Sequence, residues 1–144
     1  MMNENRVLLN DVYKRTQLSE LRVRLLGSKV QDTALTKHLN ILMEAYQGIN
    51  LQALQLLNQY GFAEKEPGSF EKAALKLRMN KSTRAGSSES AVAQLLLRNS
   101  TDNMIAMTQS LKRYENAHPT AHDIAKRLLQ IEEANISHLK VYIG

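Results

Sequence analysis

One stretch of the sequence constrains the fold more than any other feature. Between residues 32 and 61, apolar side chains recur at alternating steps of four and three residues. These residues are Leu35, Leu39, Leu42, Tyr46, Ile49, Ala53, Leu56 and Tyr60. A repeat that averages about 3.5 residues keeps one face of a helix against a neighbour over several turns. The pattern therefore predicts a long helix over 32–60 that crosses its neighbours at a shallow angle.

Residues at both ends of this stretch are typical of helix boundaries. Asp32 is a good N-cap because its carboxylate can accept a hydrogen bond from a backbone N–H of the first turn. Gly61 suits the left-handed position after the last turn, where Leu57 and Phe62 would make the apolar contact of a Schellman ending. We therefore expect the helix to begin just after Asp32 and to end just before Gly61.

Weaker versions of the same periodicity predict three more long helices and one short helix. We expect the long helices near 5–29, 87–115 and 119–142, and the short helix over 70–79. The sequence therefore predicts an all-α, single-domain protein over 1–144: a four-helix bundle, ferritin-like and up-down, with a longer connection between its second and third long helices. That connection is compatible with a ferritin-like crossover in which these two helices run parallel.

Each of these three long helices has a predicted core face. In the first helix it consists of Leu8, Val12, Leu18, Leu21 and Leu25. In the third it consists of Ala93, Leu97, Ser100, Met104, Met107, Leu111 and Tyr114. In the last it consists of Ile124, Leu128, Ile131, Asn135, His138 and Tyr142. The last helix has a second apolar face, as expected for a helix that contacts two neighbours in a bundle.

Composition excludes several classes of protein and site. The chain has no cysteine, which excludes disulfides, thiolate zinc sites and cysteine nucleophiles. It has neither a glycine-rich phosphate loop nor a nucleophile elbow, so we do not expect an enzyme. No apolar run approaches the ~20 residues that cross a bilayer, and the start lacks the basic-then-apolar layout of a signal peptide. We expect a cytoplasmic protein with no membrane partner.

Three stretches carry a resemblance to a known family. Residues 39–46, 93–100 and 125–136 read LNILMEAY, AQLLLRNS and AKRLLQIEEANI. On these stretches the chain resembles a small ferritin-like, rubrerythrin-related family of bacterial helical bundles whose function is uncharacterised. The resemblance spans most of residues 5–143. It implies the fold and almost nothing about activity.

The metal chemistry of ferritin-like proteins has exacting requirements. A di-iron centre takes a Glu from each of two helices and a Glu-x-x-His from each of the other two. Glu44 is followed three residues later by Gln47, and Glu132 is followed by Asn135. Gln94 fills the position expected for a ligand on the third long helix. We therefore expect no di-iron centre, no other metal and no cofactor.

Two residues remain as weak candidates for metal ligands. The one complete Glu-x-x-His in the sequence, Glu115 to His118, falls in the turn between the last two helices. The two weak candidates are instead Glu132 and His138, both on the last helix.

A polar set on the last helix has two interpretations. Asn135, His138 and Tyr142 are spaced three and four residues apart, so they share one face. A buried hydrogen-bond network of this kind can fix helix register, and the same residues can also mark the open end of a bundle. The functional alternative makes His138 a ligand or a proton carrier. The structural interpretation is the stronger one.

Basic residues gather around the short helix. The chain has a formal net charge of +5. The cluster consists of Lys72, Lys76, Arg78, Lys81 and Arg84. Such a cluster can contact nucleic-acid phosphates, but aromatic residues for base stacking are missing and no recognition helix is evident. We favour a solvated surface, and nucleic acid is an unfavoured alternative partner.

These observations lead to one functional expectation and two alternatives. We expect a non-enzymatic structural or protein-interaction module that pairs as a homodimer or binds another helical protein. The reason is apolar surface beyond the predicted core faces, at Met43, Leu54, Leu57, Val92, Leu95 and Leu96. The first alternative is a degenerate ferritin-like metal-binding protein. The second is a nucleic-acid-binding accessory protein that uses residues 72–84.

Overall fold

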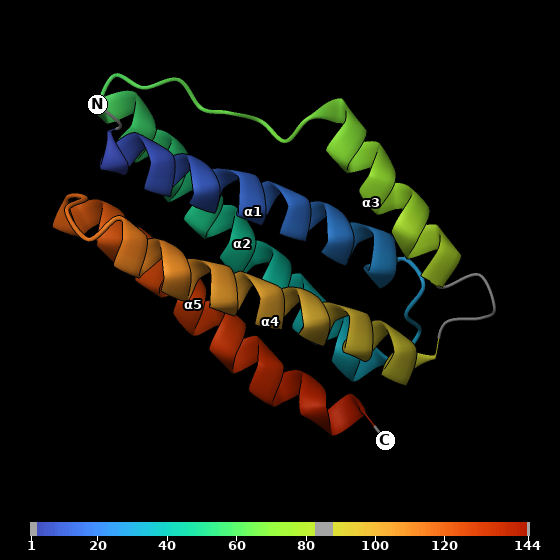
Figure 1. Ribbon diagram of the computed structural model, residues 1–144. Helices are drawn as coiled ribbons and strands as arrows, with labels where there is room; N and C mark the ends of the chain where they lie inside the picture. The colour runs from blue at the N-terminus through green and yellow to red at the C-terminus, as the bar shows by residue number, and fades with distance from the viewer. Residues whose placement is uncertain (1–2, 83–87, 144) are drawn as a thin grey trace.

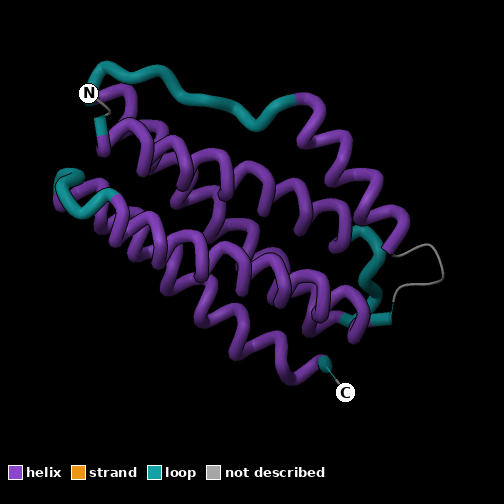
Figure 2. The backbone as a smooth tube through the Cα atoms, in the orientation of Figure 1, coloured by secondary structure: helices purple, strands orange, loops and turns teal. Residues whose placement is uncertain are grey.

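The computed structural model describes residues 3–82 and 88–143. Within these residues every regular element is helical, which confirms the prediction of an all-α protein (Figure 2). In chain order the elements are α1 (Glu4–Gly27), α2 (Thr33–Gln59), α3 (Ser69–Ser82), α4 (Glu89–Arg113), α5 (Pro119–Leu139) and the 3-10 turn η1 (Lys140–Tyr142). The expected helix ends differ from these by no more than three residues. The expected start of the third long helix near residue 87 lies outside the described residues.

The four long helices lie side by side (Figure 1). Along the chain, α1 and α2 form one antiparallel pair and α4 and α5 form another. The first helix also contacts α4 and α5, and α2 contacts α5. The connection over 60–68 carries the chain back along α1, so that α2 and α4 run in the same direction (Figure 1). The short helix α3 then packs against α1 from outside.

Both predicted ends of α2 are confirmed. The Asp32 carboxylate accepts a hydrogen bond from the backbone N–H of Leu35 at 2.8 Å. Gly61 has a φ of 78°, which is costly for any residue with a Cβ. The backbone N–H of Phe62 donates to the carbonyl of Leu57 at 2.9 Å, as in a Schellman ending. Sequence-local chemistry therefore sets where this helix starts and stops.

The predicted core face of α2 is confirmed over seven of its eight positions. The buried members are Leu35, Leu39, Leu42, Tyr46, Ile49, Ala53 and Leu56. Tyr60, just beyond the helix, is half-buried. The regular pattern of this helix therefore predicted its packing correctly.

The predicted core face of α1 is wrong over its second half. Leu18 and Leu21 are only half-buried, whereas Thr16 and Ser19 are fully enclosed. The Thr16 hydroxyl donates to the carbonyl of Val12, so the burial of this polar group is compensated. The hydroxyl of Ser19 accepts hydrogen bonds from α4, described below. The core side of α1 is therefore partly polar.

The predicted faces of α4 and α5 are also displaced by one residue in places. On α4, Leu97 and Met104 are half-buried, while Leu96 and Asn103 are buried. On α5, the buried positions are Ala121, Ile124, Ala125, Leu128, Glu132, Asn135 and Leu139. Glu132 therefore takes the core position expected for Ile131, which is half-buried.

No helix among the described residues is long and apolar enough to cross a membrane.

Candidate functional site

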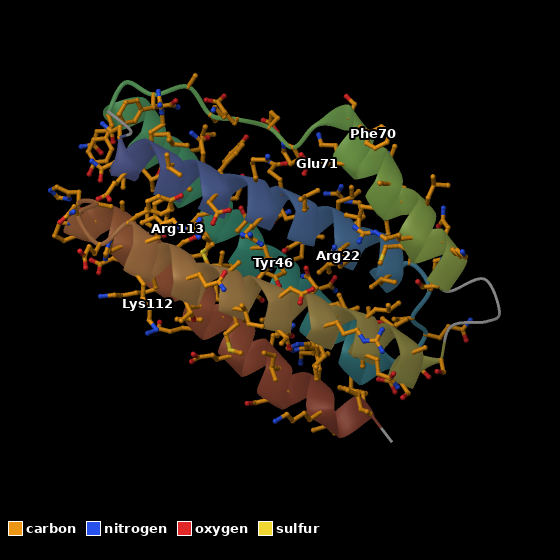
Figure 3. The ribbon with its side chains drawn as sticks, in the orientation of Figure 1. Arg22, Tyr46, Phe70, Glu71, Lys112 and Arg113 are labelled. Atoms are coloured by element: carbon orange, nitrogen blue, oxygen red, sulfur yellow. The ribbon has the colours of Figure 1, made fainter. Side chains whose placement is uncertain are left out.

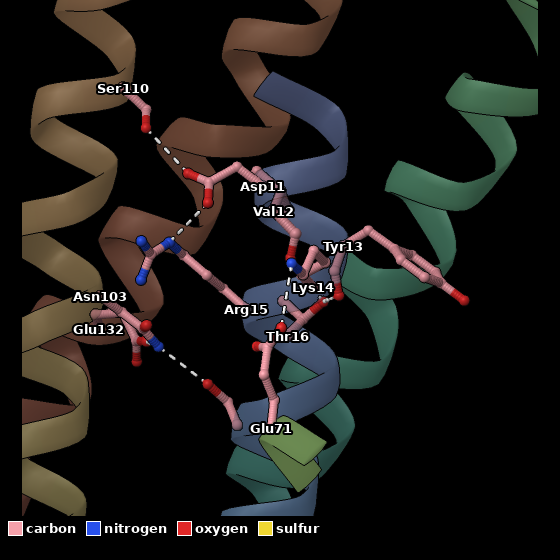
Figure 4. Close-up of polar contacts among 11 residues, drawn as sticks. Asp11, Val12, Tyr13, Lys14, Arg15, Thr16, Glu71, Asn103, Ser110 and Glu132 are labelled. Carbon is pink, nitrogen blue, oxygen red and sulfur yellow. Dashed lines mark hydrogen bonds and ion pairs between the residues drawn. The ribbon is translucent and has the colours of Figure 1, made fainter. Parts of the chain in front are cut away.

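A carboxylate lies at the centre of the helical core. Glu132 on α5 has no solvent-exposed surface. Its Oε1 accepts hydrogen bonds from the Tyr46 hydroxyl at 2.6 Å and from the Ser100 hydroxyl at 2.9 Å. Its Oε2 accepts a hydrogen bond from the Asn103 side-chain amide, and these two residues lie together in Figure 4. Helices α2, α4 and α5 thus converge on one ionisable group. We call Glu132, Tyr46, Ser100 and Asn103 the core cluster.

The core cluster extends toward α1 through small polar residues. Besides its bond to Glu132, the Asn103 amide donates to the Ser19 hydroxyl at 3.0 Å. Asn99, one turn earlier on α4, donates to the same hydroxyl at 3.4 Å. The Arg22 guanidinium in turn donates to the Asn99 side-chain carbonyl oxygen. All four long helices therefore contribute side chains to one hydrogen-bonded system.

On the opposite side the system reaches the molecular surface. The Asn135 amide donates to the Ser100 hydroxyl at 2.8 Å, and its carbonyl oxygen lies 2.6 Å from Nε2 of His38. The His38 ring stacks on the ring of His138 at a centroid distance of 3.8 Å. Tyr142 lies next to His138, with ring centroids 6.1 Å apart. The predicted set on the last helix is thus divided: Asn135 is buried, while His138 is exposed.

Burial controls the ionisation of this cluster. It raises the pKa of the Glu132 carboxyl, although hydrogen bonds from Tyr46, Asn103 and Ser100 act in the opposite direction. Burial, followed by the nearby Glu132 charge, raises the pKa of Tyr46 well above its ordinary value. Burial also lowers the pKa of His38. Burial therefore shifts all three groups toward their neutral forms.

The hydrogen bonds leave little capacity for another ligand. Among the described residues, the buried side-chain atoms without a hydrogen-bond partner are Glu4 Oε2 and Asn10 Nδ2, and neither belongs to the core cluster. A buried polar network whose members are all bonded fixes helix register, because a shift of one helix would leave several groups unpaired. The geometry therefore suits a structural role for the core cluster.

The weak metal candidates do not form a ligand set. Glu132 is enclosed at the centre of the molecule, whereas His138 is exposed near the end of α5. Within residues 3–82 and 88–143, no group of three His, Cys, Asp or Glu side chains is arranged to hold a metal ion. Gln94, which the sequence placed at a ligand position, is exposed and donates to Ser90. That placement is wrong because the core face of α4 lies one residue away.

The basic cluster lies mainly on α3. Lys76, Arg78 and Lys81 are exposed and Lys72 is half-buried. Arg84 lies outside the described residues. The helix turns Lys72 and Lys76 toward α1, where both line a cavity, whereas Arg78 lies about 200° around the helix from Lys76. The structure therefore divides this cluster instead of forming one continuous basic face.

The same helix carries the most exposed large apolar side chain of the described residues. Phe70, labelled in Figure 3, is 87% exposed, and Leu77 is 72% exposed. They are seven residues apart, which is close to two helical turns, and exposed Ala73 lies between them. Leu75 and Met79 occupy the other side of α3 and are buried. We call Phe70, Ala73 and Leu77 the outer face of α3.

The apolar residues that the sequence placed beyond the predicted core faces lie on α2 and α4, and most of their surface is covered. Leu57, Val92 and Leu96 are buried. Met43, Leu54 and Leu95 are half-buried against the same core. The expectation that one core would not hide these six residues is therefore wrong. The exposed apolar surface of α3 was not singled out from the sequence.

Sequence reasoning missed Ser19 and Asn103 as members of the polar core. The available signal was spacing: Leu96, Ser100, Asn103 and Met107 follow steps of four, three and four residues. That spacing is as regular as the apolar spacing chosen instead. A search that accepts only apolar residues at core positions rejects this spacing, because it contains Ser100 and Asn103. The buried polar face of α4 is therefore missed.

The chain matches no protein-family model, no curated protein and no solved structure.

Proposed function

We propose that this protein is a non-enzymatic, metal-free, ferritin-like four-helix bundle that acts by binding a second copy of itself through the outer face of α3. The bundle assignment is supported by the mutual contacts of the long helices and by the long connection that leaves α2 and α4 parallel. The closed hydrogen bonding around Glu132 supports a structural role for the core. The single observation that carries the interaction is the exposure of Phe70 and Leu77.

Exposed apolar residues on one face of a helix are typical of a docking surface. Helix α3 is already anchored by its inner side, where Leu75 and Met79 are buried. The outer face therefore contributes nothing to this anchoring. A second helix laid against it would remove both large side chains from water, at about 25 cal/mol for each Å² of apolar surface covered.

The sequence of α3 favours a second copy as the occupant. A twofold interface must be complementary to itself. In an antiparallel pair of α3 helices centred between residues 73 and 74, Phe70 faces Leu77 of the second copy. In the same pairing Ala73 faces Ala74 of the second copy, so small side chains meet at the axis.

The size of this surface predicts a weak dimer. A 14-residue helix is about 21 Å long at ~1.5 Å per residue. Its face buries less than the interfaces of stable complexes, which cover about 1,200–2,000 Å² in total. We therefore expect a dissociation constant in the micromolar range.

Light scattering with charge substitutions tests the proposal. At concentrations above the dissociation constant we expect twice the chain mass of 16.3 kDa, falling toward one chain on dilution. Leu77→Lys places two charges in the interface and should leave a monomer. Ile105→Lys is the matched control, because Ile105 is 50% exposed but lies on α4. A mass of 16.3 kDa that is unchanged on tenfold concentration would refute self-association.

A separate measurement tests the metal-free assignment. Metal analysis of protein purified without a chelator or a metal-affinity tag should find far less than one metal ion per chain. One transition-metal ion per chain that is lost in Glu132→Gln would instead support the degenerate metal-binding alternative.

A further inference from the structure

A polar cavity lies where α3 packs on α1, and Asn50 of α2 also lines it. Its volume is about 260 Å³. Gln17, Glu20 and Arg24 line it from α1, and Lys72 and Lys76 line it from α3. None of these residues belongs to the core cluster or to the outer face of α3. The cavity therefore needs its own explanation, and we call it the α1–α3 cavity.

Helical spacing brings the cationic groups to this place. Lys72 and Lys76 are four residues apart, so they share one side of α3. Gln17 and Arg24 are seven residues apart, so they share one side of α1. The two helices are held together by the buried Leu75 and Met79, and an ion pair of 3.5 Å joins Lys14 to Glu71 (Figure 4). The cavity is thus built by the fold.

Charge in the α1–α3 cavity is strongly unbalanced. Three cationic side chains, Arg24, Lys72 and Lys76, face one carboxylate, Glu20. Across the part of the chain that the structure describes, neither lysine forms an ion pair. Burial raises the pKa of Glu20, and the nearby Arg24 charge acts in the opposite direction. An anion would relieve this imbalance.

An amide donor completes the lining. The Gln17 amide donates to the side-chain oxygen of Asn50 at 3.3 Å. The Asn50 amide is fully used, because it donates to the carbonyl of Tyr13 and to the hydroxyl of Thr16. Asn50 therefore fixes the Gln17 amide beside the cavity. Ammonium, guanidinium and amide donors together are the groups that recognise phosphate oxygens.

We propose that the α1–α3 cavity binds phosphate, either as the inorganic ion or as the phosphate group of a small phosphomonoester. The cavity volume of about 260 Å³ lies near the lower end of the range of small-molecule sites, about 300–1,000 Å³. A phosphate with a small organic group suits that space. The site does not depend on self-association, because Phe70 and Leu77 are on another side of α3.

A second cavity shows what distinguishes this one and supplies a control. Arg15 and Arg113 line a cavity of about 210 Å³ between α1 and α4. There Asp11 pairs with Arg15 at 3.0 Å and also accepts a hydrogen bond from Ser110 (Figure 4). Its carboxylate already neutralises one arginine, so that cavity is a weaker candidate. Arg113 is exposed and can be substituted without disturbing the fold.

Calorimetric titration with inorganic phosphate and, separately, with glucose 6-phosphate tests the site and separates the two sources. Saturable binding of at least one probe is expected. Lys72→Gln and Lys76→Gln should each weaken that binding by about tenfold, the effect of losing one charge-assisted hydrogen bond. Glu20→Gln should strengthen it, since the opposing carboxylate is removed. Arg113→Gln, with the same loss of one positive charge, should leave it unchanged.

The lysine variants should weaken phosphate binding and Glu20→Gln should strengthen it, whereas loss of the fold would weaken binding in every variant. Circular dichroism of each variant checks the helices independently. Three results would overturn the proposal. The first is no saturable binding of either probe. The second is equal weakening by Lys72→Gln and Arg113→Gln, which indicates general charge attraction. The third is binding of duplex DNA without binding of either probe, which assigns these lysines to a nucleic-acid surface.

Discussion

The hydroxyl of Tyr46 donates to the carboxylate of Glu132 at 2.6 Å, and neither side chain has any exposed surface. This bond links α2 to α5 across the centre of the molecule. A buried carboxyl group that loses one donor is costly, because the remaining oxygen lone pair has no water to replace it. The bond is therefore a point where a small chemical change should have a measurable effect on folding.

Removing that hydroxyl should destabilise the protein. We expect Tyr46→Phe to lower the free energy of unfolding by about 1–3 kcal/mol, measured by urea denaturation. Tyr13→Phe is the matched control, because the Tyr13 hydroxyl donates to Glu66 at the same distance of 2.6 Å but Glu66 is exposed. The control should lose no more than about 1 kcal/mol. Equal losses in the two variants would show that burial of Glu132 has no energetic consequence.

The raised pKa of Glu132 predicts how stability depends on pH. In the unfolded chain this carboxyl has its ordinary pKa of 4.5, and in the folded chain burial raises it. Between the two values the folded state holds more protons, so stability falls as pH rises through the folded pKa. The slope is at most about 1.4 kcal/mol per pH unit.

Glu132→Gln isolates this effect because the amide does not titrate. Urea denaturation of both proteins from about pH 4 to about pH 8 gives the difference in their unfolding free energies. We expect the stability of the native protein relative to Glu132→Gln to decrease as pH rises. A difference that increases with pH would mean that the hydrogen bonds to the carboxylate outweigh its desolvation.

Sequence periodicity predicted α2 well and the other long helices less well, for a physical reason. The core face of α2 is made almost entirely of apolar residues, so a search for apolar spacing finds it. On α1 and α4 the core face includes Ser19 and Asn103, which are buried only because each has a hydrogen-bond partner on another helix. These partners are far apart in the sequence and meet only when the chain folds, so a local pattern does not show them. The search for apolar spacing therefore placed Leu18 and Met104 in the core, and both are half-buried.

The core assignment of α2 can be tested with neighbouring residues. Leu42 is 4% exposed and Ile41 is 57% exposed. Leu42→Ala should lower the free energy of unfolding by about 2–5 kcal/mol, because it removes buried surface and leaves a cavity. Ile41→Ala should change it by no more than about 0.5 kcal/mol. A loss of only a few tenths in Leu42→Ala would refute the placement of this face.

Two glycines, one inside α2 and one just after its end, should respond oppositely to alanine. Gly61 has a φ of 78°, so Gly61→Ala should destabilise the protein by about 1 kcal/mol. Gly48 lies inside α2, where an added Cβ would meet nothing within 4 Å. Gly48→Ala should therefore stabilise the protein by about 0.5–1 kcal/mol through its higher helix propensity. Thermal unfolding followed by circular dichroism measures both, and a stabilising Gly61→Ala would contradict the assigned helix ending.

Cysteine cross-linking tests the central proposal, antiparallel pairing of α3 between two copies, most directly. The chain has no cysteine, so a single introduced one can bond only to its counterpart in another copy. In the proposed register Ala73 lies next to the twofold axis, whereas the two copies of Lys81 are about 22 Å apart along the helix, at ~1.5 Å per residue. We expect Ala73→Cys to form a disulfide-linked dimer rapidly under mild oxidation. Lys81→Cys, also at an exposed position of the same helix, should remain monomeric on a denaturing gel. Cross-linking at equal rates in both variants, or in neither, would contradict this account.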